Sequence, residues 1–275
     1  MEKKTTAPAA KPAASKKSSG GLNPALVIPV LFVIGFCTWK FLLGDSSNFS
    51  DPERHHPTTA LGIVYSGGII VPILITFMLT VLVFSIERFI TIGKASGSGD
   101  LDSFVRKVRS LLDSNNISEA IKECDKQKGS VGNVTKTALE KYGKLVADTE
   151  LTKEQKLVSL QKEVEEATAL ELPMLQKNLV FISTIVSCGT LIALLGTVMG
   201  MIRSFAALGE SGGGGDSSAL AVGISEALYN TALGIGTSAL ALIIYNMLTT
   251  RIDSITYGID ESGFTLTQSF ASLYK

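Results

Sequence analysis

A long apolar stretch that contains one carboxylate constrains this chain more than any other feature. Residues 217–250 read SSALAVGISEALYNTALGIGTSALALIIYNMLTT, and Glu226 is the only acidic or basic side chain among them. A run of this length is typical of a helix that crosses a membrane. A carboxylate in hydrocarbon costs roughly 2–4 kcal/mol on insertion scales, so it is kept where it faces a protein interior or a watery path. We therefore expect Glu226 to handle protons or ions, with a structural ion pair as the alternative.

The composition indicates an integral membrane protein with one substantial soluble portion. Only 18% of the 275 residues are charged, and these charges gather in blocks, which is typical of apolar spans joined to a polar domain. Cys37 and Cys188 lie in apolar segments, where we expect buried thiols, and Cys124 lies in a charged segment. No pair of cysteines has metal-ligand spacing. We expect no metal, no cofactor and no nucleic acid partner.

Hydropathy along the chain predicts an all-α fold with four transmembrane helices, two of which extend as long helices into a soluble helical domain. Apolar runs long enough to span alternate with polar segments rich in turn formers. The expected segments are a disordered basic tail (1–21), an extra N-terminal transmembrane helix (22–43), a periplasmic loop (44–65), a transmembrane helix (66–92), a cytoplasmic helical domain (93–177), a transmembrane helix (178–208), a periplasmic loop (209–218), a transmembrane helix (219–250) and a cytoplasmic C-terminal helix (251–275).

The charged block shows helical periodicity and capping signals. Apolar residues recur at helical spacing after Asp102, a candidate cap, and further helices are expected near 118–129 and 131–147. Thr152 and Gln155 match a capping box. No strong breaker follows until Pro173, so we expect one helix from Lys153 to Leu208, about 80 Å long and bent at the proline.

The distribution of basic residues predicts the topology. Fifteen Lys and Arg lie in residues 88–177 and five Lys in the N-terminal tail, whereas the loop at 44–65 has one and the loop at 209–218 has none. Basic residues favour the cytoplasmic side, so both termini and the large block are expected there. A signal peptide is the competing interpretation of residues 22–43, but no small-x-small cleavage site follows the apolar run.

The short loop between the last two spans makes them antiparallel neighbours, and this predicts a cluster around Glu226. Thr231 is expected level with Thr197, and Asn230 lies one helical turn from Glu226 on the same face. Carboxylate and hydroxyl groups are those needed to pass a proton or to bind water in a pore. Arg203 falls near Glu226 in the same register, as a pore-lining residue or as the counter-ion of a structural pair.

Small residues are dense along both helices. Gly196 and Gly200 form a GxxxG, and Gly223 and Gly234 lie on the last helix. Small residues allow helices to approach closely in a membrane. Their density predicts an oligomer in which many helices crowd a central pore.

These segments carry a resemblance to a known family. The motifs LLGTVMGMIRSF (194–205), ALAVGISEALYNTALGIG (219–236) and IIYN (243–246) are similar to the signature of the MotA/TolQ/ExbB proton channel family, on its ExbB/TolQ side. The end of the second span at Ile86-Glu87-Arg88 also matches. The resemblance covers about residues 66–250 and is specific over the last two spans. The first span, at 25–43, lies outside it.

The resemblance implies a subunit of an inner-membrane motor in bacteria that uses the proton motive force. Such proteins assemble as homopentamers around a helix pair from an ExbD-like partner, which presents a membrane Asp, and they energise a TonB-like protein for outer-membrane transport. The family's channel Glu falls on Glu226 and its two pore threonines on Thr197 and Thr231.

Three departures concern the shape of the backbone rather than the proton-handling residues. Ser187-Cys188-Gly189 stands where the family has a proline near the start of its span, Ser238-Ala239 stands where it has Ile-Pro, and Ala193 stands where it usually has Gly. The sequence therefore does not predict whether the last two membrane helices are bent.

Other functions remain as alternatives to an ExbB-like subunit. A TolQ-like or gliding-type motor subunit fits the same residues, whereas flagellar MotA lacks the carboxylate at Glu226. A membrane scaffold in which Glu226 pairs with Arg203 is a different class. An enzyme is not expected, because the GGGG at 212–215 lacks the following Lys-Ser/Thr of a phosphate-binding loop, and no Ser/His or Cys/His set is present.

Overall fold

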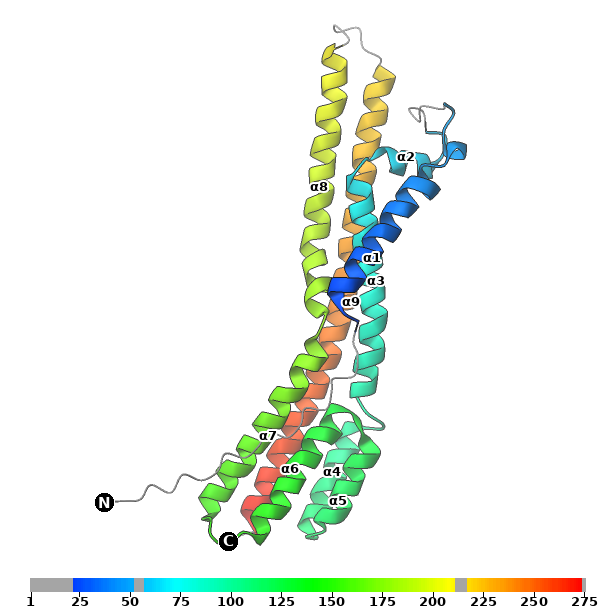
Figure 1. The fold of residues 1–275 in the computed structure, drawn as a ribbon. Helices are drawn as coiled ribbons and strands as arrows, with labels where there is room; N and C mark the ends of the chain where they lie inside the picture. Colours follow the sequence, from blue (N-terminus) through cyan, green and yellow to red (C-terminus); the bar gives the residue numbers. More distant parts are fainter. Residues whose placement is uncertain (1–21, 52–56, 211–216, 274–275) are drawn as a thin grey trace, which may run out of the picture.

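The computed structural model describes residues 22–51, 57–210 and 217–273, and it is helical throughout apart from one isolated bridge between Phe49 and Pro57 (Figure 1). The predicted tail at 1–21 and most of the predicted loop at 209–218 lie outside the described residues. The helices are α1 (Pro24–Cys37), a π-helical continuation of it (Thr38–Leu43), a 3-10 turn (Ser46–Asn48), α2 (Ala60–Ser66), α3 (Ile70–Ala95), α4 (Leu101–Asp113), α5 (Ile117–Gln127), α6 (Gly129–Ala147), α7 (Lys153–Gln176), α8 (Leu179–Glu210) and α9 (Ser217–Leu273).

Four helices are long and apolar enough to cross a membrane, as the hydropathy predicted. Helices α8 and α9 run antiparallel along each other, α3 packs against both, and α1 lies against α3. Helices α4, α6 and α7 pack against the C-terminal half of α9, and α5 packs against α4 and α6; helices α4–α7 are here called the bundle (Figure 1). Since α9 has 57 residues, it measures about 85 Å and connects the membrane helices to the bundle.

Local signals explain where two of the membrane helices begin. The Asn23 side chain caps α1 by accepting a hydrogen bond from the backbone N–H of Ala25, with Pro24 in the first helical position. Pro72 lies in the first turn of α3, where its missing N–H leaves no intrahelical bond unmade. The polar loop expected before this span contains a further short helix, α2, which ends at Ser66.

The continuous helix predicted over residues 153–208 is wrong, because the chain breaks between α7 and α8. The break lies at Asn178, whose φ of +64° is in the left-handed region, whereas Pro173 sits inside α7 without ending it. Asparagine adopts this conformation more readily than most residues. The buried Arg88 supports the break, since its guanidinium donates to the Met174 carbonyl (3.1 Å), one of the carbonyls that have no partner in the last turn of a helix.

Amphipathic helices build the bundle, and two details differ from expectation. Asp100, rather than Asp102, caps α4, because its carboxylate accepts from the Ser103 N–H (2.9 Å). Cys124 is the buried thiol of the chain, while Cys37 is exposed and Cys188 half-buried. The inner face of α5 carries Cys124 into the bundle core, and Cys37 lies on a membrane helix that has few protein neighbours.

Candidate functional site

The contacts between α8 and α9 follow the register predicted from their short connection. A Cβ atom added to Gly200 would lie 2.9 Å from the Cβ of Ala227, and one added to Gly196 would lie 3.0 Å from Ile70 of α3. Gly223 lies against Ser204, and Gly234 against the side chain of Ala193. Each of the four predicted packing glycines thus sits where a neighbouring helix leaves no room for a side chain.

A pair of threonine hydroxyls joins the two helices. The hydroxyl of Thr197 on α8 contacts that of Thr231 on α9, and either can be the donor. The Thr197 oxygen also lies 3.2 Å from the carbonyls of Ala193 and Ala227. A hydroxyl carries one hydrogen, so Thr197 can donate to only one of these three acceptors at a time. When it donates to a carbonyl, Thr231 must supply the hydrogen between the two threonines.

Glu226 lies on a different side of α9 from Thr231 and is half-buried. Asn230, one helical turn further along α9, contacts the residues between α2 and α3, so Glu226 lies near the junction of these two helices. Among the ion pairs formed within 4 Å by the described residues, none joins Arg203 to Glu226. The Arg203 side chain is itself exposed.

Two glycines between α2 and α3 make this arrangement possible. Gly68 has a φ of +74°, and a side chain added there would lie 3.3 Å from the guanidinium of Arg203. A side chain on Gly67 would collide with Asn230, whose amide donates to the Gly67 carbonyl (3.1 Å). Asn230 is buried in the single chain, so it ties α9 to the start of α3 instead of opening toward a pore.

The aromatic side chains near Ser66 indicate the level of the carboxylate in the membrane. Trp39 stacks on Tyr65 with ring centroids 4.8 Å apart, and its indole N–H donates to the Tyr65 carbonyl (3.1 Å). Trp and Tyr gather at membrane–water boundaries. Asn230 contacts Gly67, two residues after Tyr65, so Glu226, one helical turn before Asn230, lies near the boundary farther from the bundle. Thr231 is five residues further along α9, about 7.5 Å deeper toward the bundle.

The structure thus divides the predicted cluster into two neighbouring centres. One is the pair of Thr197 and Thr231, and the other is Glu226 near the α2–α3 junction, where Asn230 contacts Gly67 and Arg203 lies over Gly68. Sequence reasoning missed the contact of Asn230 with Gly67, because nothing in the chain fixes how α2 is placed against α9. The only signal was the pair Gly67-Gly68 at the start of an apolar run.

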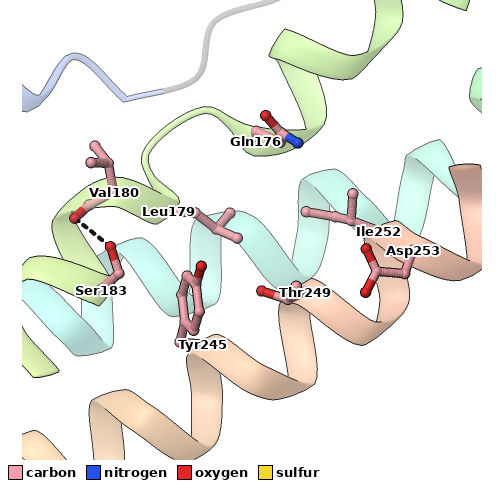
Figure 2. Close-up of a pocket in the computed structure, with 8 residues that line it drawn as sticks. All are labelled: Gln176, Leu179, Val180, Ser183, Tyr245, Thr249, Ile252 and Asp253. Carbon is pink, nitrogen blue, oxygen red and sulfur yellow. Dashed lines mark hydrogen bonds between the residues drawn. The ribbon is translucent and has the colours of Figure 1, made fainter.

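A cavity lies away from these two centres. It has a volume of about 330 Å³, sits between the α7–α8 break and α9, and is lined by one carboxylate, that of Asp253 (Figure 2). The buried hydroxyl oxygen of Thr249 in its wall has no hydrogen-bond partner. The described residues also hold no cluster of three His, Cys, Asp or Glu that could bind a metal ion. The candidate chemistry therefore rests on the two centres between the membrane helices.

Comparison with known proteins identifies a family whose model matches about half of the chain. The model of the MotA/TolQ/ExbB proton channel family matches residues 126–261, which include Thr197, Glu226 and Thr231. An ExbB homolog of Methanothermobacter thermautotrophicus is 24% identical over 205 residues, which are 74% of this chain and 68% of that protein. The match therefore extends well beyond the region that carries the site residues.

Two further relatives are more similar over shorter regions. The biopolymer transport protein ExbB of Helicobacter pylori is 40% identical over 92 residues, 34% of this chain and 62% of the relative. The Tol-Pal system protein TolQ of Haemophilus influenzae is 35% identical over 88 residues, 31% of this chain and 37% of the relative. Across the curated relatives, the matched regions cover from 34% to 68% of the relatives' own lengths.

Proposed function

The chain belongs to the MotA/TolQ/ExbB proton channel family, and we propose that it is the proton-channel subunit of an inner-membrane motor of the ExbB type. Membership makes it a multi-pass membrane protein and a non-enzymatic component of a transport system. Within the family, both an ExbB and a TolQ protein are similar to the chain. The proposal of an ExbB-like motor is supported by ExbB-type relatives and by the motifs of the last two spans.

The observation that carries the proposal is the paired hydroxyls of Thr197 and Thr231, one and a half helical turns from a lone carboxylate in an apolar helix. A carboxylate can take up and release a proton, and two hydroxyls that exchange donor and acceptor roles can pass one on. In the proposed function, Glu226 receives the proton near the outer boundary, and the threonine pair transfers it inward.

The proposed motor needs other chains. An ExbD-like partner would present a second membrane carboxylate to the pore, and a TonB-like protein would transmit the resulting movement to outer-membrane transport. Copies of this chain would form a pentamer around the partner's helices, with both termini and the bundle in the cytoplasm of a bacterium. A TolQ-like or gliding-type motor would use the same residues with other partners.

The contrasting proposal is a non-conducting scaffold in which Glu226 and Arg203 form a structural pair. In the described residues these two groups do not approach within 4 Å. A bridge that replaces the proton path would need direct contact, because only a close pair offsets the cost of burying both charges. The geometry therefore favours the channel.

A transport assay tests the proposal. The wild-type chain and Glu226→Gln are each co-expressed with the neighbouring ExbD-like gene in a strain that lacks both, and energy-dependent outer-membrane uptake is measured. We expect uptake to be abolished while native gels show an intact complex. The matched control is Glu261→Gln, the same change on the bundle half of α9, which should keep wild-type uptake. Normal uptake by Glu226→Gln would exclude the proposed role.

A further inference from the structure

We propose that Asp253 releases the transported proton to the cytoplasm from the cavity between the α7–α8 break and α9 (Figure 2). This inference rests on the proposed function, since it adds the last step of the same proton transfer. Asp253 is the next carboxylate after Glu226 along α9, at the other end of the apolar stretch. It is therefore placed to hold the proton after the membrane has been crossed.

The cavity lies where the membrane helices meet the bundle. The apolar span of α8 begins at Leu179, which lines the cavity, and Gln176, the last residue of α7, lines it on the bundle side. Between Glu226 and Arg251, α9 carries no charged side chain. Asp253, two residues after Arg251, therefore lies where this helix leaves the hydrocarbon.

The cavity lies along the same helix interface as the threonine pair. Thr249, in its wall, follows Thr231 by 18 residues, about five complete turns of α9, so both point to the same side of the helix, about 27 Å apart. On that side Thr231 contacts Thr197 of α8, and the cavity separates Thr249 from the start of α8. Between them, the buried hydroxyl of Ser238 donates to the Ile185 carbonyl of α8 (3.3 Å). Polar groups thus recur along this interface down to the cavity.

The cavity offers hydrogen-bonding groups to water. Its volume of about 330 Å³ leaves room for several water molecules at about 30 Å³ each. The buried hydroxyl oxygen of Thr249 has no hydrogen-bond partner among the described residues, whereas most buried polar groups have one. Tyr245 and Ser183 add hydroxyl groups to the wall. Water that enters here gains hydrogen bonds, and hydrogen-bonded water can carry a proton.

Asp253 can exchange a proton with this cavity and with the water around the bundle. It is exposed, and it also lines a groove between α9 and the start of α4. In the described parts of the chain it forms no ion pair within 4 Å. The nearby Arg251 lies instead over the ring of Phe89 on α3, with its Cζ 5.5 Å from the ring centroid. No ion pair with a described residue therefore competes with the proton for this carboxylate.

Release takes two proton transfers. A hydrated proton in the cavity gives its hydrogen to the Asp253 carboxylate, which leaves a water molecule and a neutral carboxylic acid. The acid then gives the hydrogen to a water molecule outside, which restores the carboxylate and yields a hydrated proton in the cytoplasm. Thr249 lies one turn before Asp253 on the same face of α9. Its hydroxyl holds cavity water beside the carboxylate, so Thr249 is a positioning residue.

Proton flux through vesicles tests this step in the full chain, reconstituted with its ExbD-like partner. Asp253→Asn removes the titratable group and Asp253→Glu keeps it. The matched control is Asp260→Asn, an exposed carboxylate further along α9 that does not line the cavity. Thr249→Val removes the unpartnered hydroxyl. Its control is Thr256→Val, because the Thr256 hydroxyl already donates to the Ile252 carbonyl one turn back (3.0 Å).

We expect Asp253→Asn to reduce flux at least about tenfold and Thr249→Val about threefold, with Asp253→Glu and both controls near wild type. Wild-type flux in Asp253→Asn would overturn the inference, as would an equal loss in Asp253→Glu. If Asp253→Asn does not assemble on native gels, Asp253→Ser takes its place.

Glu226→Gln, measured beside these variants, separates the inference from the proposed function. Wild-type flux in Glu226→Gln would refute the proposed function itself. Loss of flux in Glu226→Gln together with wild-type flux in Asp253→Asn would refute only the release site.

Discussion

The hydroxyls of Thr197 and Thr231 have a feature that few membrane threonines share. Threonines in membrane helices usually bond only to their own backbone, as Thr184 does on α8 by donating to the Val180 carbonyl (2.7 Å). Thr197 instead has acceptors on both helices as well as the other hydroxyl. Because several arrangements of two hydrogens satisfy this set, the pair can change direction without breaking the helix contact.

We therefore predict that proton transfer depends on the hydroxyl group of Thr197 and not on the volume of its side chain. Thr197→Val keeps the volume and removes the hydrogen, so we expect proton-driven uptake to fall by about tenfold or more while the complex still assembles. Thr184→Val on the same helix is the control and should retain uptake. Equal uptake in the two variants would contradict a role of the pair in proton transfer.

Arg203 gives a second prediction at the level of single residues. Since it does not contact Glu226 directly and is exposed, Arg203→Ala should assemble to the wild-type level on native gels. A structural pair predicts the reverse, because a buried carboxylate without its partner is strongly destabilising. Loss of assembly in Arg203→Ala that is restored by adding Glu226→Gln would support the scaffold and contradict the channel.

Among the elements, helices with strong local signals were predictable and their junctions were not. The capping box of Thr152 and Gln155 is present, and the antiparallel register of α8 and α9 placed Thr197 beside Thr231. The break at Asn178 was missed, because its left-handed backbone depends on support from Arg88 and from Leu22, whose carbonyl accepts the Asn178 amide (3.2 Å). Such contacts between distant segments leave no periodic pattern in a sequence.

The break at Asn178 can be tested through the backbone alone. Glycine adopts a positive φ freely, whereas alanine at such a position costs roughly 1–2 kcal/mol. Both Asn178→Gly and Asn178→Ala lose the amide bond to Leu22, so the difference between them isolates the backbone. We expect a lower thermal midpoint for Asn178→Ala than for Asn178→Gly in detergent. Equal midpoints would show that the left-handed conformation is not required.

We expect the stability of the bundle to depend on pH through the carboxyl group of Glu123. Glu123 accepts hydrogen bonds from Lys107 (2.7 Å) and Lys126, and these bonds lower the pKa of its carboxyl group below the ordinary value of 4.5. A lowered pKa adds stability above the ordinary value, and this stability is lost as the pH falls through the lowered pKa.

We therefore expect Glu123→Gln to reduce the thermal midpoint at pH 7 and to narrow the difference between pH 7 and pH 3. Circular dichroism during heating measures both effects. The exposed Glu150 offers a control, and Glu150→Gln should leave the difference unchanged. The same pH sensitivity in wild type and Glu123→Gln would contradict this role of the lysines.

At the scale of the whole molecule, the proposed motor predicts that exposed apolar surface on the bundle lies between copies of the chain. Lipid can cover such side chains along the membrane spans, but Tyr257 and Phe264, both 67% exposed, lie on α9 where it passes through the bundle. In the proposed assembly, these two side chains would lie in contacts between copies. We expect native mass spectrometry to detect an oligomer, five copies in the proposed motor, and to detect fewer copies when both residues are changed to serine. A monomeric wild type would contradict the proposed assembly.

Proton flux through the isolated complex tests the proton-channel function most directly. The wild-type chain and Glu226→Gln, each purified with the ExbD-like partner, are reconstituted into vesicles with a pH-sensitive dye inside, and a proton gradient is imposed. We predict flux in the wild type and, in Glu226→Gln, flux no greater than in empty vesicles, with the same oligomer present in both preparations. Undiminished flux in Glu226→Gln would show that protons do not pass through this carboxylate.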